Sequence, residues 1–118
     1  MTELIACLST GKGTWGHVSR LMQDGKWDKV FLITNDYGKE NFTKDTKTEL
    51  IAINLNQGIK ELRDEIYNNL KGKIKGSEVA INVISGMGRE HMALISALLK
   101  LGIGFRLYAL TKDGVEEI

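Results

Sequence analysis

The chain has 118 residues, of which 42% are hydrophobic and 26% are charged, and its formal net charge is +1. These values are typical of one globular domain and exclude a disordered or fibrous protein. So balanced a charge gives no global field that would recruit duplex nucleic acid or an anionic membrane, and any recognition of an anion has to be local. We expect a single domain over residues 1–118, because the length leaves no room for a nucleotide domain plus a separate substrate domain.

Cys7 is the only cysteine, and it lies within an apolar run. A single thiol allows no internal disulfide and no structural zinc site, and it fits a reducing compartment. The N-terminus lacks the pattern of a secretory leader, and no apolar run has the length needed to span a bilayer. We therefore expect a cytoplasmic protein with no membrane partner. The two histidines, His17 and His91, have no spacing that predicts a metal site.

The first two predicted strands are short apolar runs. Leu4–Leu8 ends in Ser-Thr-Gly and is followed by Val18, Leu21 and Met22, whose spacing predicts a helix with one apolar face. Val30–Ile33 contains β-branched residues and ends in Thr-Asn-Asp, residues that favour turns and helix caps, so it is the second predicted strand. The chain thus begins as strand, helix, strand.

The middle of the chain contains the clearest helical pattern. Tyr37–Lys47 is polar and is compatible with a short helix or a loop, and Leu50–Leu55 is the third predicted strand. Beyond it, apolar residues recur at intervals of three and four positions, and charged residues occupy the other positions. The apolar residues of this predicted helix are Ile59, Leu62, Ile66 and Leu70.

Two more strands flank a third helix in the last part of the chain. Val79–Ile84 and Phe105–Leu110 are predicted strands, and Met92–Leu101 is a predicted helix between them. All five strands are apolar on consecutive residues, which is typical of strands covered on both faces. Strands that alternate with helices therefore predict an α/β domain with a Rossmann-like, three-layer, doubly wound sheet of mainly parallel strands.

Glycine-rich loops follow the first and the fourth predicted strands. Residues 9–16 read Ser-Thr-Gly-Lys-Gly-Thr-Trp-Gly, and residues 85–91 read Ser-Gly-Met-Gly-Arg-Glu-His. In open parallel sheets, ligands bind at the carboxyl ends of strands where the strand order reverses, so we expect both loops to form one site. Small residues, hydroxyls, backbone N–H groups at a helix start and a cation favour a phosphate-containing ligand. The expected binding residues are Ser9, Thr10, Gly11, Lys12, Gly13, Trp15, Asp36, Ser85, Gly86, Met87, Gly88, Arg89 and His91.

Several of these side chains have a second interpretation. Trp15 can stack on a base, or it can pack against neighbouring side chains. His91 can contact the ligand or donate a proton, or it can be an ordinary surface histidine. Asn35 and Asp36 can select a sugar hydroxyl, or they can cap the next segment.

Two nucleotide motifs can be compared with the first loop. A P-loop requires glycine at the position of Ala6 and Ser or Thr at the position of Gly13, so it is excluded. The dinucleotide fingerprint G-x-G-x-x-G is matched by Gly11, Gly13 and Gly16, and Asp36 follows the second strand where a ribose-binding acid is expected. A regulatory domain that binds NAD or another nucleotide is therefore one alternative function.

Residues 81–89, Ile-Asn-Val-Ile-Ser-Gly-Met-Gly-Arg, lead into an apolar helix and the strand Phe105–Leu110. This region resembles the signature region of CARF domains, named for the CRISPR-associated Rossmann fold. In that family the fourth strand ends in a Thr/Ser-Gly-Gly-Thr-Lys-like loop, which lines a cyclic oligoadenylate site at a dimer interface together with the loop after the first strand. Here Met87, Gly88 and Arg89 replace the usual Gly, Thr and Lys. Arg89 retains the positive charge of the usual lysine, and its planar guanidinium group can contact phosphate through two hydrogen bonds.

The resemblance implies a homodimeric sensor of cyclic oligoadenylates or related nucleotides in a CRISPR-type antiviral system, with no cofactor, which passes its signal to an effector protein or ends the signal. Some CARF domains cleave their ligand without a metal, through attack of a ribose 2′-hydroxyl on the adjacent phosphate. The residues implied for such a ring nuclease are Ser9, Thr10 and Arg89, with Lys12 stabilising charge. No general base is evident, so cleavage stays open, and a non-catalytic interaction scaffold is the third alternative.

Overall fold

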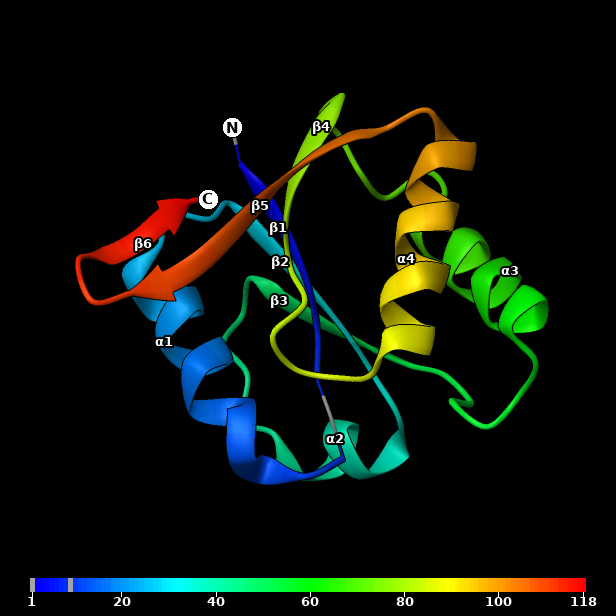
Figure 1. The fold of residues 1–118 in the computed structure, drawn as a ribbon, viewed down its shortest axis with the longest axis horizontal. Coiled ribbons are helices and arrows are strands. Elements are labelled where there is room, and N and C mark those ends of the chain that lie inside the picture. Colours follow the sequence, from blue (N-terminus) through cyan, green and yellow to red (C-terminus); the bar gives the residue numbers. More distant parts are fainter. Residues whose placement is uncertain (1, 9) are drawn as a thin grey trace.

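Strands and helices alternate along residues 2–8 and 10–118, the residues that the computed structural model describes (Figure 1). The helical elements are a 3-10 turn, η1 (Lys12–Thr14), and the helices α1 (Trp15–Asp24), α2 (Asp36–Asn41), α3 (Ile59–Leu70) and α4 (Gly88–Leu101). The strands are β1 (Glu3–Cys7), β2 (Lys29–Thr34), β3 (Thr48–Ala52), β4 (Glu78–Asn82), β5 (Gly104–Thr111) and β6 (Gly114–Glu117).

The strands form one sheet in the order β3-β2-β1-β4-β5-β6. Pairing is parallel from β3 through β5, and β6 returns antiparallel beside β5. The predicted α/β class with a mainly parallel, Rossmann-like sheet is therefore confirmed. The strand order reverses between β1 and β4, which is the switch point where this kind of sheet binds ligands.

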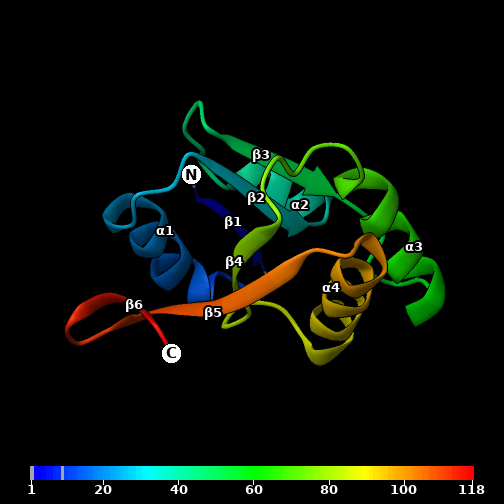
Figure 2. The same cartoon turned by 90° about the horizontal axis from the view of Figure 1, so that it is seen from above.

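Helices cover both faces of the sheet, with α1 on one side and α3 and α4 on the other (Figure 2). Successive residues of β1 alternate between the two layers, as side chains of a strand must. Leu4 and Ala6 belong to the core cluster that α1 covers, whereas Ile5 and Cys7 belong to the cluster that contains residues of α3 and α4. The consecutive apolar residues of β1, β2 and β4 thus have the physical cause expected from the sequence. The expectation is wrong for β5, in which every residue is at least partly exposed.

The predicted helix after the third strand is confirmed. Leu62, Ile66 and Leu70 of α3 are fully buried, and each such side chain contributes about 1.5–3 kcal/mol through removal from water. Ile59 differs from the expected apolar face, because it stands at the first position of the helix and is 42% exposed.

α4 begins at Gly88 rather than Met92, one turn before the predicted start. The physical reason is a cap that the apolar periodicity does not report: the Glu90 carboxylate accepts a hydrogen bond from the Met87 backbone N–H at 3.3 Å. The earlier start brings Arg89 and Glu90 onto the first turn of the helix.

β3 also differs from its predicted bounds, since it spans Thr48–Ala52 instead of Leu50–Leu55. The Asn54 side chain accepts a hydrogen bond from the Asn56 backbone N–H at 2.9 Å, which turns the chain just beyond the strand. Polar residues at 54–57 therefore lie at the carboxyl edge of the sheet.

Tyr37–Lys47, for which the sequence left helix and loop open, begins inside the short helix α2 and continues as irregular chain after Asn41. Asn35 caps α2 by accepting a hydrogen bond from the Gly38 backbone N–H at 3.1 Å. β6 was not predicted, because Gly-Val-Glu-Glu has no apolar run, and it forms through pairing with β5. Across the described residues, no helix has both the length and the apolar character needed to cross a membrane.

Candidate functional site

The two glycine-rich loops meet at the switch point of the sheet. Thr14 of the loop after β1 donates a hydrogen bond from Oγ1 to Oγ of Ser85, in the loop after β4, over 2.6 Å. Ser85 is fully buried at this junction. The expectation that loops 71 residues apart in sequence come together is therefore confirmed.

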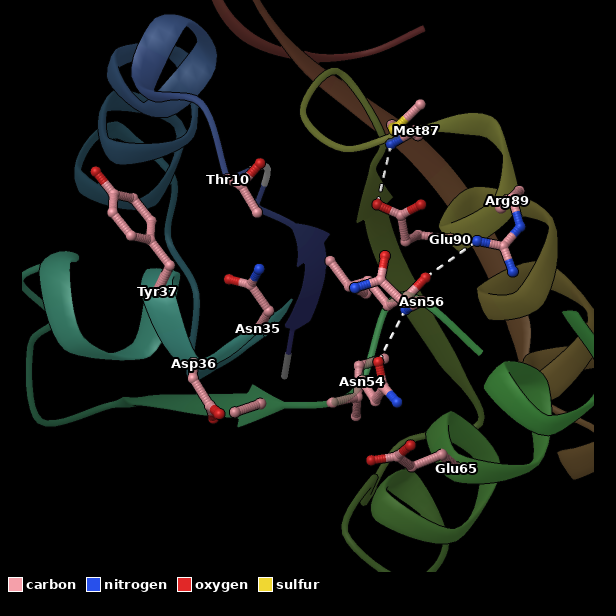
Figure 3. A pocket seen from close by; sticks show the side chains of 13 residues that line it. Thr10, Asn35, Asp36, Tyr37, Asn54, Asn56, Glu65, Met87, Arg89 and Glu90 are labelled. Carbon is pink, nitrogen blue, oxygen red and sulfur yellow. Dashed lines mark hydrogen bonds between the residues drawn. The ribbon is translucent and has the colours of Figure 1, made fainter. Parts of the chain in front are cut away.

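A cavity of about 590 Å³ opens beside this junction, at the carboxyl ends of β1 to β4 (Figure 3). Its volume lies within the range of small-molecule sites, about 300–1,000 Å³. Its walls come from the segments that follow the four strands. The lining residues are Thr10, Asn35, Asp36, Tyr37, Ala52, Ile53, Asn54, Leu55, Asn56, Glu65, Met87, Arg89 and Glu90.

Four of the predicted site residues line this cavity, namely Thr10, Asp36, Met87 and Arg89. Ser9 lies outside the described residues. The other predicted residues lie in or next to the two loops but not among the cavity-lining residues. They are Gly11, Lys12, Gly13, Trp15, Ser85, Gly86, Gly88 and His91.

Arg89 connects the second loop to a part of the chain that the sequence did not associate with it. Its guanidinium donates hydrogen bonds to the backbone carbonyls of Leu55, at 3.0 Å, and of Gln57. The side chain therefore holds the segment between β3 and α3, which forms one wall of the cavity. A guanidinium carries five N–H donors, so these two bonds leave donors for a ligand.

Trp15 packs against residues near α2. Its ring lies 6.1 Å from the ring of Tyr37 and 5.5 Å, edge-on, from that of Phe42. The Lys12 ammonium lies 5.7 Å from the centre of the Trp15 ring, a distance typical of a cation–π contact. These contacts favour the packing interpretation of Trp15 and place Lys12 over its ring.

The two histidines contact the backbone or side chains near the switch point. His91 Nε2 lies 2.8 Å from the Ser85 carbonyl oxygen, so its N–H donates to the second loop and orients it. His17 Nε2 lies 3.3 Å from Nδ2 of the buried Asn82 and 3.5 Å from the Leu110 backbone N–H, from which it accepts. Both rings thus support the ends of β4 and β5.

Cys7 of β1 and Glu90 at the start of α4 are both buried next to Gly86 of the second loop. Burial, and to a smaller extent the negative charge of Glu90, together raise the pKa of the Cys7 thiol from 9.0 to about 12. The thiol is therefore neutral and is no candidate nucleophile.

The polar lining residues that the sequence analysis did not assign to the site are Tyr37, Asn54, Asn56, Glu65 and Glu90. One signal was available for two of them. The run Asn-Leu-Asn-Gln follows the third predicted strand just as Asn35 and Asp36 follow the second, and the carboxyl ends of parallel strands share one edge. Glu65 lies on a helix, where no local pattern marks it.

The charge of the cavity differs from the charge expected for a phosphate site. Its lining contains three carboxylates, Asp36, Glu65 and Glu90, and one guanidinium, Arg89. Glu65 also accepts a hydrogen bond from the Gln57 side chain. An anion inside the cavity would be repelled by the carboxylates, whereas hydroxyl and amino groups would find acceptors. Among the described residues, no three acidic, histidine or cysteine side chains come together as a metal site.

Fold and site together define a Rossmann-like α/β domain with a polar cavity at the carboxyl edge of its sheet. Comparison of the chain with protein-family models and with curated proteins finds no match.

Proposed function

We propose that this domain is a sensor that binds a cyclic oligoadenylate or a related nucleotide. The observation that carries the proposal is the Thr14–Ser85 hydrogen bond, which joins the two glycine-rich loops at the switch point beside an open polar cavity. This is the place where parallel α/β sheets bind nucleotides. The resemblance of residues 81–89 to the CARF signature supports the same ligand class.

The charged side chains favour different parts of the proposed ligand at the rim and inside the cavity. The phosphates lie at the rim, where Lys12, Arg89 and the backbone N–H groups at the start of α4 favour anions. The three carboxylates keep phosphate out of the cavity itself. The nucleoside parts of the ligand are left to occupy it.

Homodimerisation belongs to the proposal, because a single small domain covers only part of a ring-shaped ligand. Large apolar side chains are exposed close to the second loop and along α4, which supports a contact with a second copy. They are Ile84, Met87, Met92, Leu99 and, on β5, Leu107. Light scattering at micromolar concentration tests this part, and a strict monomer with and without ligand would count against it.

Cleavage of the ligand by this domain would need no metal. The ribose 2′-hydroxyl oxygen would form a bond to the adjacent phosphorus, and the bond from phosphorus to the 5′-oxygen would break. This leaves a 2′,3′-cyclic phosphate and a 5′-hydroxyl, to which the proton is returned. Thr10 would position the reacting groups and Arg89 would stabilise the charge that grows on phosphate.

Binding of NAD is a second candidate, and one observation favours it. Asp36 directly follows β2 and lines the cavity, which is the position of a ribose-binding acid in dinucleotide domains. Thermal shift separates the two candidates. Stabilisation by NAD that is lost in Asp36→Ala would support the dinucleotide function, and stabilisation by cyclic tetra- or hexa-adenylate would support the sensor.

The decisive residue for the sensor is Arg89. If it contacts phosphate, Arg89→Ala weakens the binding of cyclic oligoadenylate by about ten- to a hundredfold, because a charge-assisted hydrogen bond contributes about 1.5–3 kcal/mol. Arg89→Lys recovers part of this loss, since lysine keeps the positive charge but lacks the planar guanidinium group that can form two hydrogen bonds to phosphate. Calorimetric titration measures the affinities.

The matched control for this series is Arg20→Ala, which removes an exposed arginine of α1 that pairs with Asp24. Its affinity should equal that of the wild type. Equal affinities of the wild type, Arg89→Ala and Arg89→Lys would remove Arg89 from the phosphate site.

A further inference from the structure

Two asparagines present fixed hydrogen-bond donors to the cavity. The Asn35 side-chain oxygen is used by the Gly38 backbone N–H, and that of Asn54 by the Asn56 backbone N–H. Only the oxygen of an amide can accept these bonds, so the Nδ2 group of each side chain has a defined direction. Neither Nδ2 group donates a hydrogen bond within the described part of the chain. Both residues line the cavity (Figure 3).

A buried carboxylate supplies an acceptor on the opposite wall. Glu90 is only 6% exposed, and its Oε1 accepts a hydrogen bond from the Met87 backbone N–H. Among the described residues, no fully buried side-chain oxygen lacks a hydrogen bond. The other oxygen of Glu90 has no donor among residues 2–8 and 10–118, so it keeps an accessible surface on the cavity that Glu90 lines. A carboxylate oxygen in so enclosed a place is stabilised by a donor from a ligand.

Donors and acceptors thus alternate around a space that repels anions. Asp36, below Asn35 in Figure 3, adds an acceptor on the side of β2. A matching ligand is uncharged, carries an amino group for Glu90 and ring acceptors for Asn54, and has hydroxyl groups for Asp36. An adenine nucleoside has this set of groups, and asparagine is a frequent partner of adenine.

We propose that the cavity at the ends of β2, β3 and β4 binds the adenosine part of the ligand and reads its 6-amino group through Glu90. This inference rests on the proposed nucleotide function. Asn54 donates to a ring nitrogen of the base, and Asp36 accepts from the ribose hydroxyls. The phosphates stay outside, next to Lys12 and the start of α4.

The first experiment uses free adenosine and inosine, which differ at position 6 of the base and carry no phosphate. In a ¹H–¹⁵N NMR titration of the full chain, adenosine shifts the amide signals of residues 52–56 and 87–90. It binds at least tenfold more tightly than inosine, because the 6-carbonyl of inosine cannot donate to Glu90. Equal affinities for the two nucleosides would overturn the assignment of Glu90.

The second experiment replaces the accessible acceptor oxygen of Glu90 with a hydrogen-bond donor. In Glu90→Gln the side-chain oxygen still accepts from the Met87 N–H, and the new amide N–H faces the cavity. This variant loses adenosine affinity at least tenfold and binds inosine as well as adenosine or better. Glu61→Gln, an exposed change in the first turn of α3, leaves both affinities unchanged.

A third variant keeps the proposal testable if Glu90→Gln does not fold. Asn54→Asp retains an oxygen for the Asn56 N–H but replaces the donor with a second acceptor, and Asn54 is exposed, so the fold tolerates the change. Adenosine affinity falls about tenfold in this variant.

The outcomes separate this inference from the proposed function. If cyclic oligoadenylate binds with unchanged affinity to Glu90→Gln and Asn54→Asp, the proposal that the cavity binds adenosine is wrong. The proposal that the domain is a sensor is then retained. If adenosine binds as described but cyclic oligoadenylates do not, the assignment of the cavity to adenosine is retained and the sensor function is wrong. If neither binds, both are overturned.

Discussion

The two glycine-rich loops have similar compositions but depend on glycine for different reasons. A Cβ atom added at Gly11, Gly13 or Gly16 of the first loop and the start of α1 would meet no atom within 4 Å. A Cβ added at Gly86 of the second loop would lie 3.0 Å from Cβ of Cys7 and 3.2 Å from Nε2 of His91. Gly86 also has φ +94°, which side chains rarely allow.

Packing of the folded chain requires the glycine of the second loop but not the glycines of the first loop. The second loop lies directly on β1, and its shape requires glycine at position 86 even without a ligand. The folded chain gives no steric reason for the glycines of the first loop. The proposed function assigns them a different role, in which a ligand approaches the backbone of this loop.

The largest effect expected from this comparison is the protection of Cys7 beneath the second loop. With a pKa of about 12 in place of 9.0, the thiolate fraction at pH 8 is lower by about a thousandfold. Iodoacetamide at pH 8 should therefore leave the native protein unmodified over hours and label it once denaturant is added. Mass spectrometry measures this.

The same pKa shift predicts the direction of the pH dependence. The pKa of Cys7 is higher in the folded protein than in the unfolded chain. The neutral thiol therefore makes its full contribution to the free energy of unfolding below pH 9, and this contribution is lost as the pH rises toward 12. Labelling of the native protein at the rate of an exposed thiol would contradict the close packing of the second loop on Cys7.

The next effect is the loss of stability in Gly86→Ala. The unfavourable backbone conformation and the contact with Cys7 together should lower the free energy of unfolding by about 2–4 kcal/mol. Gly88→Ala is the matched control within the same loop. Its Cβ would meet no atom within 4 Å and it begins α4, so stability should be unchanged or raised by about 0.5–1 kcal/mol. Urea denaturation compares the two, and equal stabilities would remove the steric argument.

The smallest effect on the fold is expected in the first loop. Gly11→Ala and Gly13→Ala should change the free energy of unfolding by less than about 0.5 kcal/mol, because both positions are exposed and open. If a ligand approaches this backbone, the same variants should weaken the binding of cyclic oligoadenylate by about tenfold or more. Stable variants with unchanged affinity would return these glycines to the role of simple turn residues.

The sequence by itself predicted the α/β class, five of the strands and the meeting of the two loops at one edge. These features follow from local properties. Consecutive apolar residues in β1, β2 and β4 report burial on both faces, and the three- and four-residue spacing of α3 reports one buried helix face. The rule that parallel sheets bind ligands at their carboxyl ends then located the cavity, to which Thr10, Asp36, Met87 and Arg89 contribute.

Only the tertiary structure decided which polar groups share the cavity and what charge it has. Arg89 bonds to Leu55 and Gln57, more than 30 positions away, and Glu65 faces the cavity from the middle of an amphipathic helix. Periodicity reports whether a side chain is buried but not which distant segment it meets. The cavity is therefore richer in carboxylates than its glycine-rich loops implied, because its walls come from the segments after β2 and β3 and from α3 as much as from the two loops.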